Sequence, residues 1–375
     1  MRPSKQVALL IETSNAYARG LLRGVMAYVR EHQPWGLRLT EHGRGEVSRG
    51  ELVEWKGQGI IARVENERIA ATLRDFRRPV VDVSAARLLP KLPWVETDDA
   101  AIAKAAADHL LSRGLTNFGF YGDDRFNWSR WRQEAFHRCI AAAGFACSDA
   151  PQARGTGKLA DWVRALPKPA GVMACYDIRG RELIDACRAA EVEIPDEVAV
   201  IGVDDDELLC ELSDPPLSSV IPDVRRTGWV AAEILDAWMS GSRPAELQHP
   251  IPPLGVATRR STDMLAVEDA DLAAAVRFIR EHACDGITVA DVVGKLPLSR
   301  RVLESRFERV LGRSPHAEIL RVRLERVKQL LTQPGWTLDA IAHKTGFHHG
   351  EYLSAVFKRE TNLTPGAYRR QHRLD

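Results

Sequence analysis

The sequence predicts an α/β region, followed by a smaller all-α region built from two copies of one helical unit. Three observations support this prediction. Short apolar runs alternate with amphipathic segments through residues 1–262, and a motif occurs twice in the last hundred or so residues, about 50 residues apart. Charge is also unevenly divided, at +6 over residues 270–375 and −5 over residues 1–269.

Composition restricts the class of protein. At 375 residues the chain is too long for one hydrophobic core. The first apolar run, Val7–Ile11, is too short for a signal peptide, and no run reaches the roughly 18 apolar residues of a membrane span. The six cysteines are scattered with no C-x-x-C pair, which is typical of reduced thiols. We therefore expect a cytoplasmic protein with no membrane partner, no metal and no cofactor.

Residues 1–262 show a repeated strand–helix rhythm. Each predicted strand is a short apolar run, and an amphipathic segment follows it. The strands are Val7–Ile11, Gly59–Ala62, Val80–Val83, Phe118–Tyr121, Gly171–Ala174 and Val198–Val203, and the helices are 18–31, 65–76, 99–113, 128–143, 178–190 and 224–240. This alternation predicts parallel sheets covered by helices on both faces.

The residues that follow these strands suggest a ligand. No G-x-G-x-x-G, Walker A or G-x-S-x-G sequence follows them, so neither a nucleotide site nor a hydrolase is indicated. The carboxyl ends of the strands instead carry Ser14–Tyr17, Glu96–Asp98, Tyr121-Gly122, Tyr176-Asp177 and Asp204–Asp206. A carboxylate accepts hydrogen bonds from adjacent hydroxyls, and an aromatic ring covers the apolar face of a sugar. This set therefore suits a polyol.

Other interpretations of the same acids stay open. Asp98 and Asp177 can each cap the helix that follows. The Asp204–Asp206 run can be a solvated loop or a cation site, although three acids on one loop without further ligands are weak evidence for metal.

The helical motif of the last third predicts two helix-turn-helix units. In each copy a threonine that can act as a cap, Thr288 or Thr337, opens a short helix. A turn and a second helix follow, at 299–311 and 349–360, with a long helix at His316–Leu331 between the copies. The second helices carry apolar stripes that we expect to be buried: Val302, Leu303 and Phe307, and Tyr352, Leu353, Val356 and Phe357.

A generic helical domain would explain these stripes, but not the repeat together with polar side chains at the helix starts. The segment Ile341–Arg369, IAHKTGFHHGEYLSAVFKRETNLTPGAYR, closely resembles the signature of arabinose-regulator (AraC/XylS) type DNA-binding domains. Asn362 stands where that pattern usually has glycine, and asparagine also tolerates the left-handed conformation.

This resemblance implies which residues meet DNA. Base-edge readers would be Arg300, Arg301, Glu304 and Ser305 in the first recognition helix and His349, Gly350, Glu351 and Ser354 in the second. Phosphate contacts would be Arg306, Lys358 and Arg359.

The α/β region has a resemblance of its own. Val200–Glu207 (VIGVDDDE), Pro215–Val220 and Gly228 resemble the lactose/galactose-repressor ligand-binding fold, as do Asp98-Asp99, Ser129–Arg132 and Tyr176-Asp177. The resemblance implies a type I periplasmic-binding-protein fold, whose two lobes close on a ligand. It implies sugar contacts from Asp98, Arg132, Asp177 and Asp204, with further contacts from Asn15, Tyr17 and Trp128. Tyr176 departs from the usual asparagine.

The combination predicts a sensor domain at 1–262, a linker at 263–270 and a DNA-binding domain at 271–375. Such a fusion resembles the bacterial xylose-operon regulators. It implies a homodimeric, sugar-responsive transcriptional regulator that binds promoter DNA, with a pentose such as D-xylose as effector, activation as the outcome and a contact with RNA polymerase. The rivals are a sugar-binding transport component and a sugar-converting enzyme, and the helical repeat opposes both.

Overall fold

The computed structural model describes residues 5–32, 34–39, 55–152, 156–264, 269–333 and 335–372. The chain forms two compact units. The first comprises Met1–Leu111 and Thr116–Thr262, and the second comprises Ser112–Leu115 and Asp263–Asp375. Residues 265–268 of the predicted linker lie outside the described residues.

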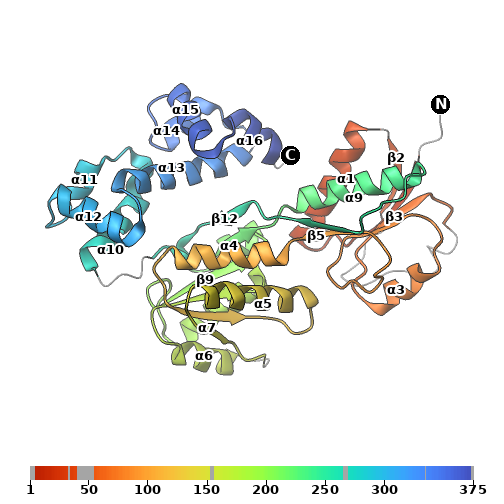
Figure 1. Ribbon diagram of the computed structural model, residues 1–375, viewed down its shortest axis with the longest axis horizontal. Coiled ribbons are helices and arrows are strands. Elements are labelled where there is room, and N and C mark those ends of the chain that lie inside the picture. The colour runs from red at the N-terminus through yellow and green to blue at the C-terminus, as the bar shows by residue number, and fades with distance from the viewer. Residues whose placement is uncertain are drawn as a thin grey trace. The chain divides into compact units, whose positions relative to one another are not determined.

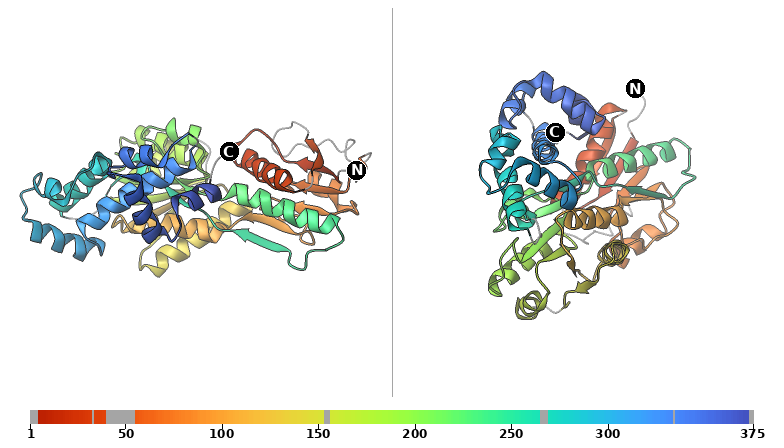
Figure 2. Two further views of the ribbon diagram at one scale, coloured as in Figure 1. Left: turned by 90° about the horizontal axis from the view of Figure 1, so that it is seen from above. Right: turned by 60° about the vertical axis from the view of Figure 1, so that its left-hand side comes forward.

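The first lobe of the first unit is a six-stranded parallel sheet in the order β11-β5-β4-β3-β1-β2 (Figure 1). Its strands are β1 (Lys5–Leu10), β2 (Trp35–Leu39), β3 (Gly59–Ala62), β4 (Val80–Asp82), β5 (Trp94–Thr97) and β11 (Gln248–Ile251). Helices α1 (Ala16–Glu31) and α9 (Val224–Met239) lie side by side on one face, and α3 (Glu67–Arg74) packs on the other (Figure 2).

Two glycines allow α1 and α9 to approach closely. A Cβ on Gly24 would lie 2.1 Å from the carbonyl oxygen of Arg225, and a Cβ on Gly228 would lie 2.1 Å from that of Leu21. Any larger residue would therefore push the two helices apart, away from the core that they share with the sheet.

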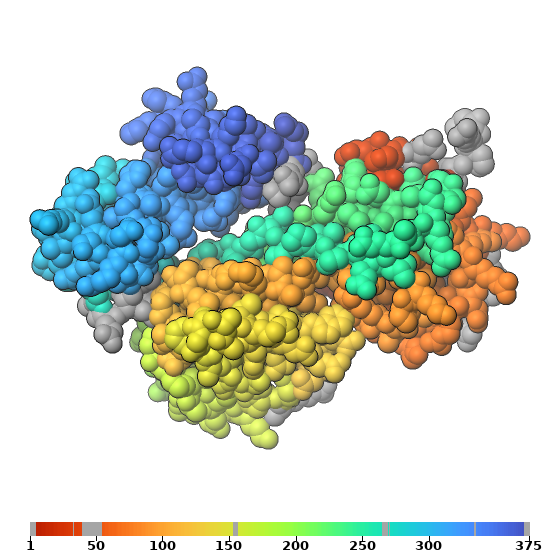
Figure 3. Space-filling view, viewed as in Figure 1, coloured from red at the N-terminus to blue at the C-terminus, as the bar shows by residue number. Residues whose placement is uncertain are grey.

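The second lobe is a six-stranded sheet in the order β12-β10-β9-β8-β6-β7, and only the β10–β12 pair is antiparallel. Its strands are β6 (Asn117–Tyr121), β7 (Cys147–Asp149), β8 (Ala170–Ala174), β9 (Val198–Val203), β10 (Ser218–Ile221) and β12 (Gly255–Ala257). Its helices are α4 (Asp99–Leu111), α5 (Asn127–Ala142), α6 (Thr156–Ala165), α7 (Asp177–Ala189), α8 (Glu207–Glu211) and the 3₁₀ turn η1 (Arg260–Thr262). Helices α4 and α5 pack against each other (Figure 3).

The chain passes between the lobes three times. The crossings lie between β5 and α4, between β10 and α9, and between β11 and β12. Three short crossings leave the lobes free to rotate about this hinge while each sheet stays intact.

All six predicted strands and the six helices predicted between them are present, and the expected fold class is confirmed. Six strands went unpredicted for identifiable reasons. Four of them, β2, β7, β11 and β12, lie at sheet edges, and β11 contains Pro250. The other two are four-residue strands with polar pairs, Glu96-Thr97 in β5 and Ser218-Ser219 in β10. Such strands lack the apolar runs on which the prediction depended.

The second unit consists of helices α10 (Ala270–His282), α11 (Val289–Val293), α12 (Arg300–Leu311), α13 (Pro315–Thr332), α14 (Leu338–Lys344), α15 (Gly350–Thr361) and α16 (Pro365–His372), with the 3₁₀ turn η2 (Ala283–Asp285). Two hydrophobic cores lie within it. Ile319 of α13 joins the first core, and Leu324, Val327, Leu330 and Leu331 of the same helix join the second. One long helix therefore supports both helix-turn-helix units, as predicted.

Two residues of the predicted apolar stripes are exposed rather than buried. Leu303, Phe307, Leu353 and Phe357 are buried, but Val302 is 39% exposed and Tyr352 is 58% exposed. Val302 and Tyr352 occupy equivalent positions in the two copies, beside the buried leucines. The apolar stripe is thus narrower than predicted, and both recognition helices present an apolar side chain to solvent.

The helix ends follow the predicted capping. The hydroxyl of Thr337 accepts a hydrogen bond from the Ala340 amide at 3.2 Å, and Thr288 exchanges its cap interactions with Asp291. Gly312 and Asn362 end α12 and α15 with φ of 62° and 59°, so asparagine adopts the left-handed conformation as expected. None of the described helices is long and apolar enough to span a membrane.

Candidate functional site

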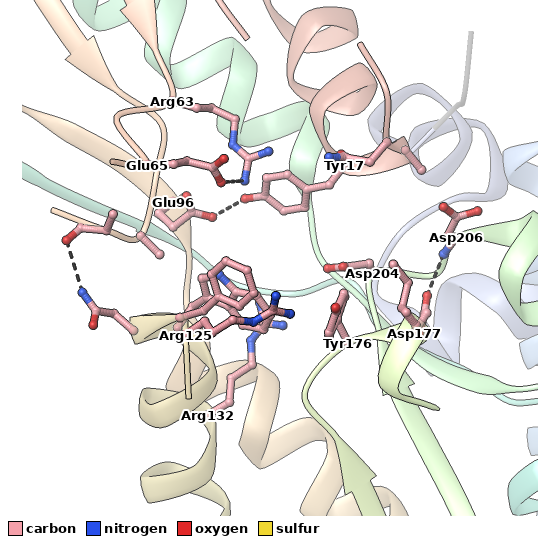
Figure 4. Close-up of a pocket in the computed structure, with 18 of the residues that line it drawn as sticks. Tyr17, Arg63, Glu65, Glu96, Arg125, Arg132, Tyr176, Asp177, Asp204 and Asp206 are labelled. Atoms are coloured by element: carbon pink, nitrogen blue, oxygen red, sulfur yellow. Dashed lines mark hydrogen bonds and ion pairs between the residues drawn. The ribbon is translucent and has the colours of Figure 1, made fainter. Parts of the chain in front are cut away.

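A cavity of about 410 Å³ lies between the lobes of the first unit (Figure 4). Both lobes contribute to its wall, at the carboxyl ends of their strands. The polar and aromatic lining residues are Ser14, Asn15, Tyr17, Arg63, Glu65, Glu96, Arg125, Phe126, Asn127, Trp128, Arg132, Tyr176, Asp177, Asp204 and Asp206. The size and the mixture of apolar walls with a few polar groups are typical of a small-molecule site.

The wall from the first lobe is a network of buried charges. The Tyr17 hydroxyl donates a hydrogen bond to Glu96. Arg63 binds Glu12 and, at 2.7 Å, Glu65, and its guanidinium lies 5.3 Å from the centre of the Tyr17 ring. Burial raises the pKa of Glu96 to about 7, although Tyr17 and Arg63 act to lower it. Burial and the adjacent Glu96 also raise the pKa of Tyr17, so its hydroxyl remains a donor.

The wall from the second lobe is aromatic and carries a buried ion pair. Trp128 stacks on Phe126, with ring centroids 5.0 Å apart, and meets Tyr176 edge to face at 5.4 Å. Arg132 lies over Trp128, its Nε donates to Asp99 at 2.8 Å, and its Nη1 donates to the carbonyl of Cys175 at 2.7 Å. These contacts fix both the arginine and the indole ring in place, which gives the cavity a preformed apolar face beside a positive charge.

A loop of three acids, Asp204–Asp206, closes the end of the cavity beside Asp177. The Asp177 carboxylate accepts from the Ser219 hydroxyl at 2.6 Å. It also accepts from the Asp206 amide at 2.8 Å (Figure 4). Burial, followed by the charge of Asp204, raises the pKa of Asp177 well above its ordinary value. Asp204 and Asp205 have φ of 105° and 49°, which is unusual for non-glycine residues. Such backbone persists only where surrounding contacts hold it.

Six of the seven predicted sugar residues line the cavity: Asn15, Tyr17, Trp128, Arg132, Asp177 and Asp204. The seventh, Asp98, does not. Its carboxylate accepts from the amides of Ala100 and Ala101, both at 3.0 Å, and so caps α4. The next residue, Asp99, is the one that pairs with Arg132. Asn15 is also partly committed, because it caps α1 and donates to Glu12.

Five of the polar and aromatic lining residues were not predicted from the sequence: Arg63, Glu65, Arg125, Phe126 and Asn127. Arg63 and Glu65 follow β3, so the rule that ligands bind at the carboxyl ends of strands would have found them. Arg125 and Phe126 lie further from the end of β6, and only the folded loop brings them to the cavity. Within the described residues no group of three or more His, Cys, Asp or Glu side chains is placed to hold a metal ion.

In the second unit, α12 presents most of its predicted readers. Arg300, Arg301, Glu304 and Ser305 are exposed, and Arg300 pairs with Glu304 at 2.9 Å on its own helix. Arg306 differs, because it is half-buried and its Nη1 lies 2.7 Å from Asp269 and 3.4 Å from Asp271. These acids at the start of α10 neutralise the arginine that we expected to meet phosphate.

On α15 the predicted base-edge readers and phosphate contacts also differ in exposure. His349, Glu351, Lys358 and Arg359 are exposed, and Ser354 is half-buried. Gly350 is buried, and a Cβ there would lie 2.5 Å from the Asp339 carboxylate, which accepts its amide hydrogen at 3.1 Å. Gly350 therefore positions the start of the helix. Arg359 pairs with Glu360 at 2.8 Å.

A buried carboxylate fixes the helix that joins the two copies. Glu318 of α13 is fully buried and pairs with Arg313 and Arg321, both at 2.7 Å, and with Arg280 at 3.9 Å. Burial opposes its ionisation, but these arginines lower the pKa of Glu318 to about 2. The network ties α10 and the loop that follows α12 to α13, the helix that joins the two copies.

Three family models match this chain. The XylR N-terminal domain matches residues 6–100, the periplasmic binding protein-like domain matches residues 107–262, and the helix-turn-helix domain matches residues 292–371. The second model covers most of the second lobe together with α9 and β11 of the first, and the third covers the tandem helical units.

The whole chain also resembles individual proteins. The xylose operon regulatory protein of Escherichia coli K12 is 31% identical over 97% of this chain and 96% of its own length. That of Haemophilus influenzae is 29% identical over 97% of this chain and 98% of its own length. The solved structure of the xylose-binding transcription activator XylR superposes with a TM-score of 0.64 at 30% identity, covering 99% of both chains. The chain therefore belongs to the family of xylose operon regulatory proteins.

Proposed function

We propose that this chain is a cytoplasmic, sugar-responsive activator of a carbohydrate-utilisation operon, with D-xylose or a related pentose as its effector. One observation carries the proposal: the same chain has a cavity between the lobes of its first unit and a tandem helix-turn-helix in its second unit. Buried carboxylates and a preformed Trp128 face suit a neutral polyol. The similarity to regulators named for xylose supports the same effector.

The proposed mechanism is closure of the lobes on the sugar. Hydroxyls of the sugar would accept from Arg132 and donate to the acids around Asp177, while its apolar face would lie against Trp128. The sugar can shift the equilibrium from the open to the closed state only by the ratio of its affinities for these two states. The two recognition helices, α12 and α15, would read successive major grooves of promoter DNA. The protein is proposed to act as a homodimer, to contact RNA polymerase and to catalyse no reaction.

The direct test measures sugar and DNA binding on the purified chain. D-xylose should raise the melting temperature, and more than D-glucose or L-arabinose does, because a ligand that binds only the folded state stabilises it by mass action. DNA selected from a random-sequence pool should bind with a different affinity once D-xylose is added.

A matched pair of tryptophan variants tests the site. Trp128→Leu should abolish the D-xylose response, whereas Trp238→Leu should keep it, because Trp238 is half-buried on α9 outside the cavity. Failure of every sugar to shift the melting temperature would refute the sensor function. Turnover of D-xylose would favour a sugar-converting enzyme instead.

A further inference from the structure

The last residues of the first unit, Arg259–Thr262, are held firmly to the second lobe, and we call them the exit segment. The Ser261 hydroxyl donates to the carbonyl of Val200 at 2.6 Å and accepts from the Ser218 amide at 2.8 Å. The Ser218 hydroxyl lies 2.7 Å from the Thr262 hydroxyl. Ser218, Ser261 and Thr262 are all fully buried. The chain therefore leaves this unit from a fixed point on β9 and β10.

One route connects the exit segment to the cavity through Arg259. Its guanidinium pairs with Asp205 at 2.8 Å and with Glu211 at 2.9 Å, and it donates to the carbonyl of Leu217 at 3.1 Å. Asp205 does not line the cavity, but its two neighbours, Asp204 and Asp206, do. Arg259 therefore contacts the Asp204–Asp206 loop on the side that faces away from the cavity.

The conformation of that loop depends on such contacts. Asp204 and Asp205 both have positive φ, a strained conformation for non-glycine residues that persists only where surrounding contacts offset the strain. The Asp205 amide donates to Ser219 at 3.0 Å, and the Asp205 carboxylate meets Arg259. Ser219 in turn donates to Asp177. The loop is therefore held on one side by Ser219, which is bonded to the cavity residue Asp177, and on the other side by Arg259 of the exit segment.

A second route reaches the same segment through α4. The helix begins at Asp99, which pairs with Arg132 in the cavity wall. Ten residues later in the same helix, the Nε2 atom of His109 lies 2.8 Å from the Thr262 hydroxyl. A rigid helix thus joins the cavity to the exit segment independently of Arg259.

We propose that Arg259 is a positioning residue that couples sugar binding to DNA binding. A sugar held by Asp204 and Asp206 fixes the loop, the loop fixes Arg259 through Asp205, and Arg259 sets the exit segment that leads to the second unit. This inference rests on the proposed function, since it requires a sugar that changes DNA affinity.

The test measures a coupling ratio, defined as the dissociation constant for selected DNA without D-xylose divided by that with saturating D-xylose. Allosteric couplings are typically about 5- to 150-fold. Asp205→Asn keeps the size of the side chain, and asparagine also tolerates the left-handed backbone conformation. The substitution removes only the charge that faces Arg259. We expect it to lower the ratio at least about threefold, and Arg259→Gln to do the same.

Glu211→Gln is the matched control. It removes the other carboxylate that Arg259 contacts, which is 59% exposed and lies at the far end of α8, outside the Asp204–Asp206 loop. Its coupling ratio should equal that of the wild type. Circular dichroism and melting temperature establish that each variant folds, and Asp205→Asn decides the question if Arg259→Gln does not fold.

A second readout separates coupling from ordinary stabilisation. By linkage, DNA must change the D-xylose affinity by the same ratio, which calorimetry measures with and without DNA. A merely structural role would weaken D-xylose binding equally in both conditions and leave the ratio unchanged.

An unchanged ratio in Asp205→Asn, or an equal loss in Glu211→Gln, overturns the inference. Wild-type protein that binds D-xylose and DNA without any coupling also overturns it, whereas wild-type protein that binds no D-xylose refutes the proposed function itself.

Discussion

The cavity and the recognition helices use charged residues in opposite ways. In the cavity, most charged side chains are buried, and the central pair joins two elements, since Arg132 of α5 pairs with Asp99 of α4. On the recognition helices, charged side chains are mostly exposed and pair within their own helix, as Arg300 does with Glu304. Arg306 is the exception, since Asp269 and Asp271 of α10 hold it.

This difference teaches which changes each region tolerates. Removing one partner of a buried pair leaves an uncompensated charge and is strongly destabilising, whereas an exposed pair contributes about 0–1 kcal/mol. The cavity is therefore preorganised, with its shape dependent on every member of the network. The recognition helices can change their sequence readout while the fold stays intact. Variants in the cavity should mix stability with binding, and variants on the recognition helices should alter binding alone.

The largest expected effect is at Arg132. Arg132→Met leaves the Asp99 carboxylate buried without its guanidinium and removes the cation over Trp128. We expect the free energy of unfolding to fall by about 3–5 kcal/mol and D-xylose binding to be lost. Urea denaturation and calorimetry measure the two effects.

The double variant Arg132→Met/Asp99→Leu separates these effects. Because it removes both charges, it should recover much of the stability while still failing to bind D-xylose. Recovery of sugar binding along with stability would show that Arg132 only supports the fold.

A smaller effect should come from the titration of Glu96. Its pKa is about 7 in the folded protein, against an ordinary value near 4.5. Between these values the folded state holds a proton that the unfolded chain has released. The free energy of unfolding should therefore decrease as the pH rises through this window, by about 3 kcal/mol in total.

Glu96→Gln is the control for this titration, because it keeps an acceptor for Tyr17 but cannot ionise. Asp177 also has a raised pKa and contributes with the same sign, so the quantity to compare is the difference between wild type and variant from pH 5 to pH 8. Parallel stability curves for the two proteins would contradict a buried, titrating Glu96.

The parts that the sequence predicted well depend on local patterns. Apolar runs located the central strands, and the helical repeat located both recognition helices to within a residue or two. The capping threonines and the left-handed Asn362 also follow from local rules. In the cavity, residues that directly follow strands were predictable because a parallel sheet gathers them at one edge.

What the sequence could not predict depends on partners that are distant in the chain. Asp98 and Asp99 are adjacent acids, and only the packing of α5 decides that Asp99 meets Arg132 while Asp98 caps α4. In the same way, nothing near Arg306 indicates that Asp269 will neutralise it. The exposure of Tyr352 was missed because an aromatic residue at a helical spacing is usually buried.

The smallest effect on stability, and the sharpest on specificity, should come from Arg301. Arg301→Ala should leave the free energy of unfolding within about 0.5 kcal/mol of the wild type, because the side chain is exposed on α12. It should cost about 1–3 kcal/mol of discrimination at one position of the selected DNA, as expected for an arginine that reads a guanine edge.

Lys358→Gln removes the same charge from the exposed surface of α15 and is the matched control. It should weaken binding to all sequences alike and reduce the salt dependence of binding by about one counterion. If Arg301→Ala also weakens all sequences alike, Arg301 contacts phosphate, and α12 orients the protein on DNA without reading the base at that position.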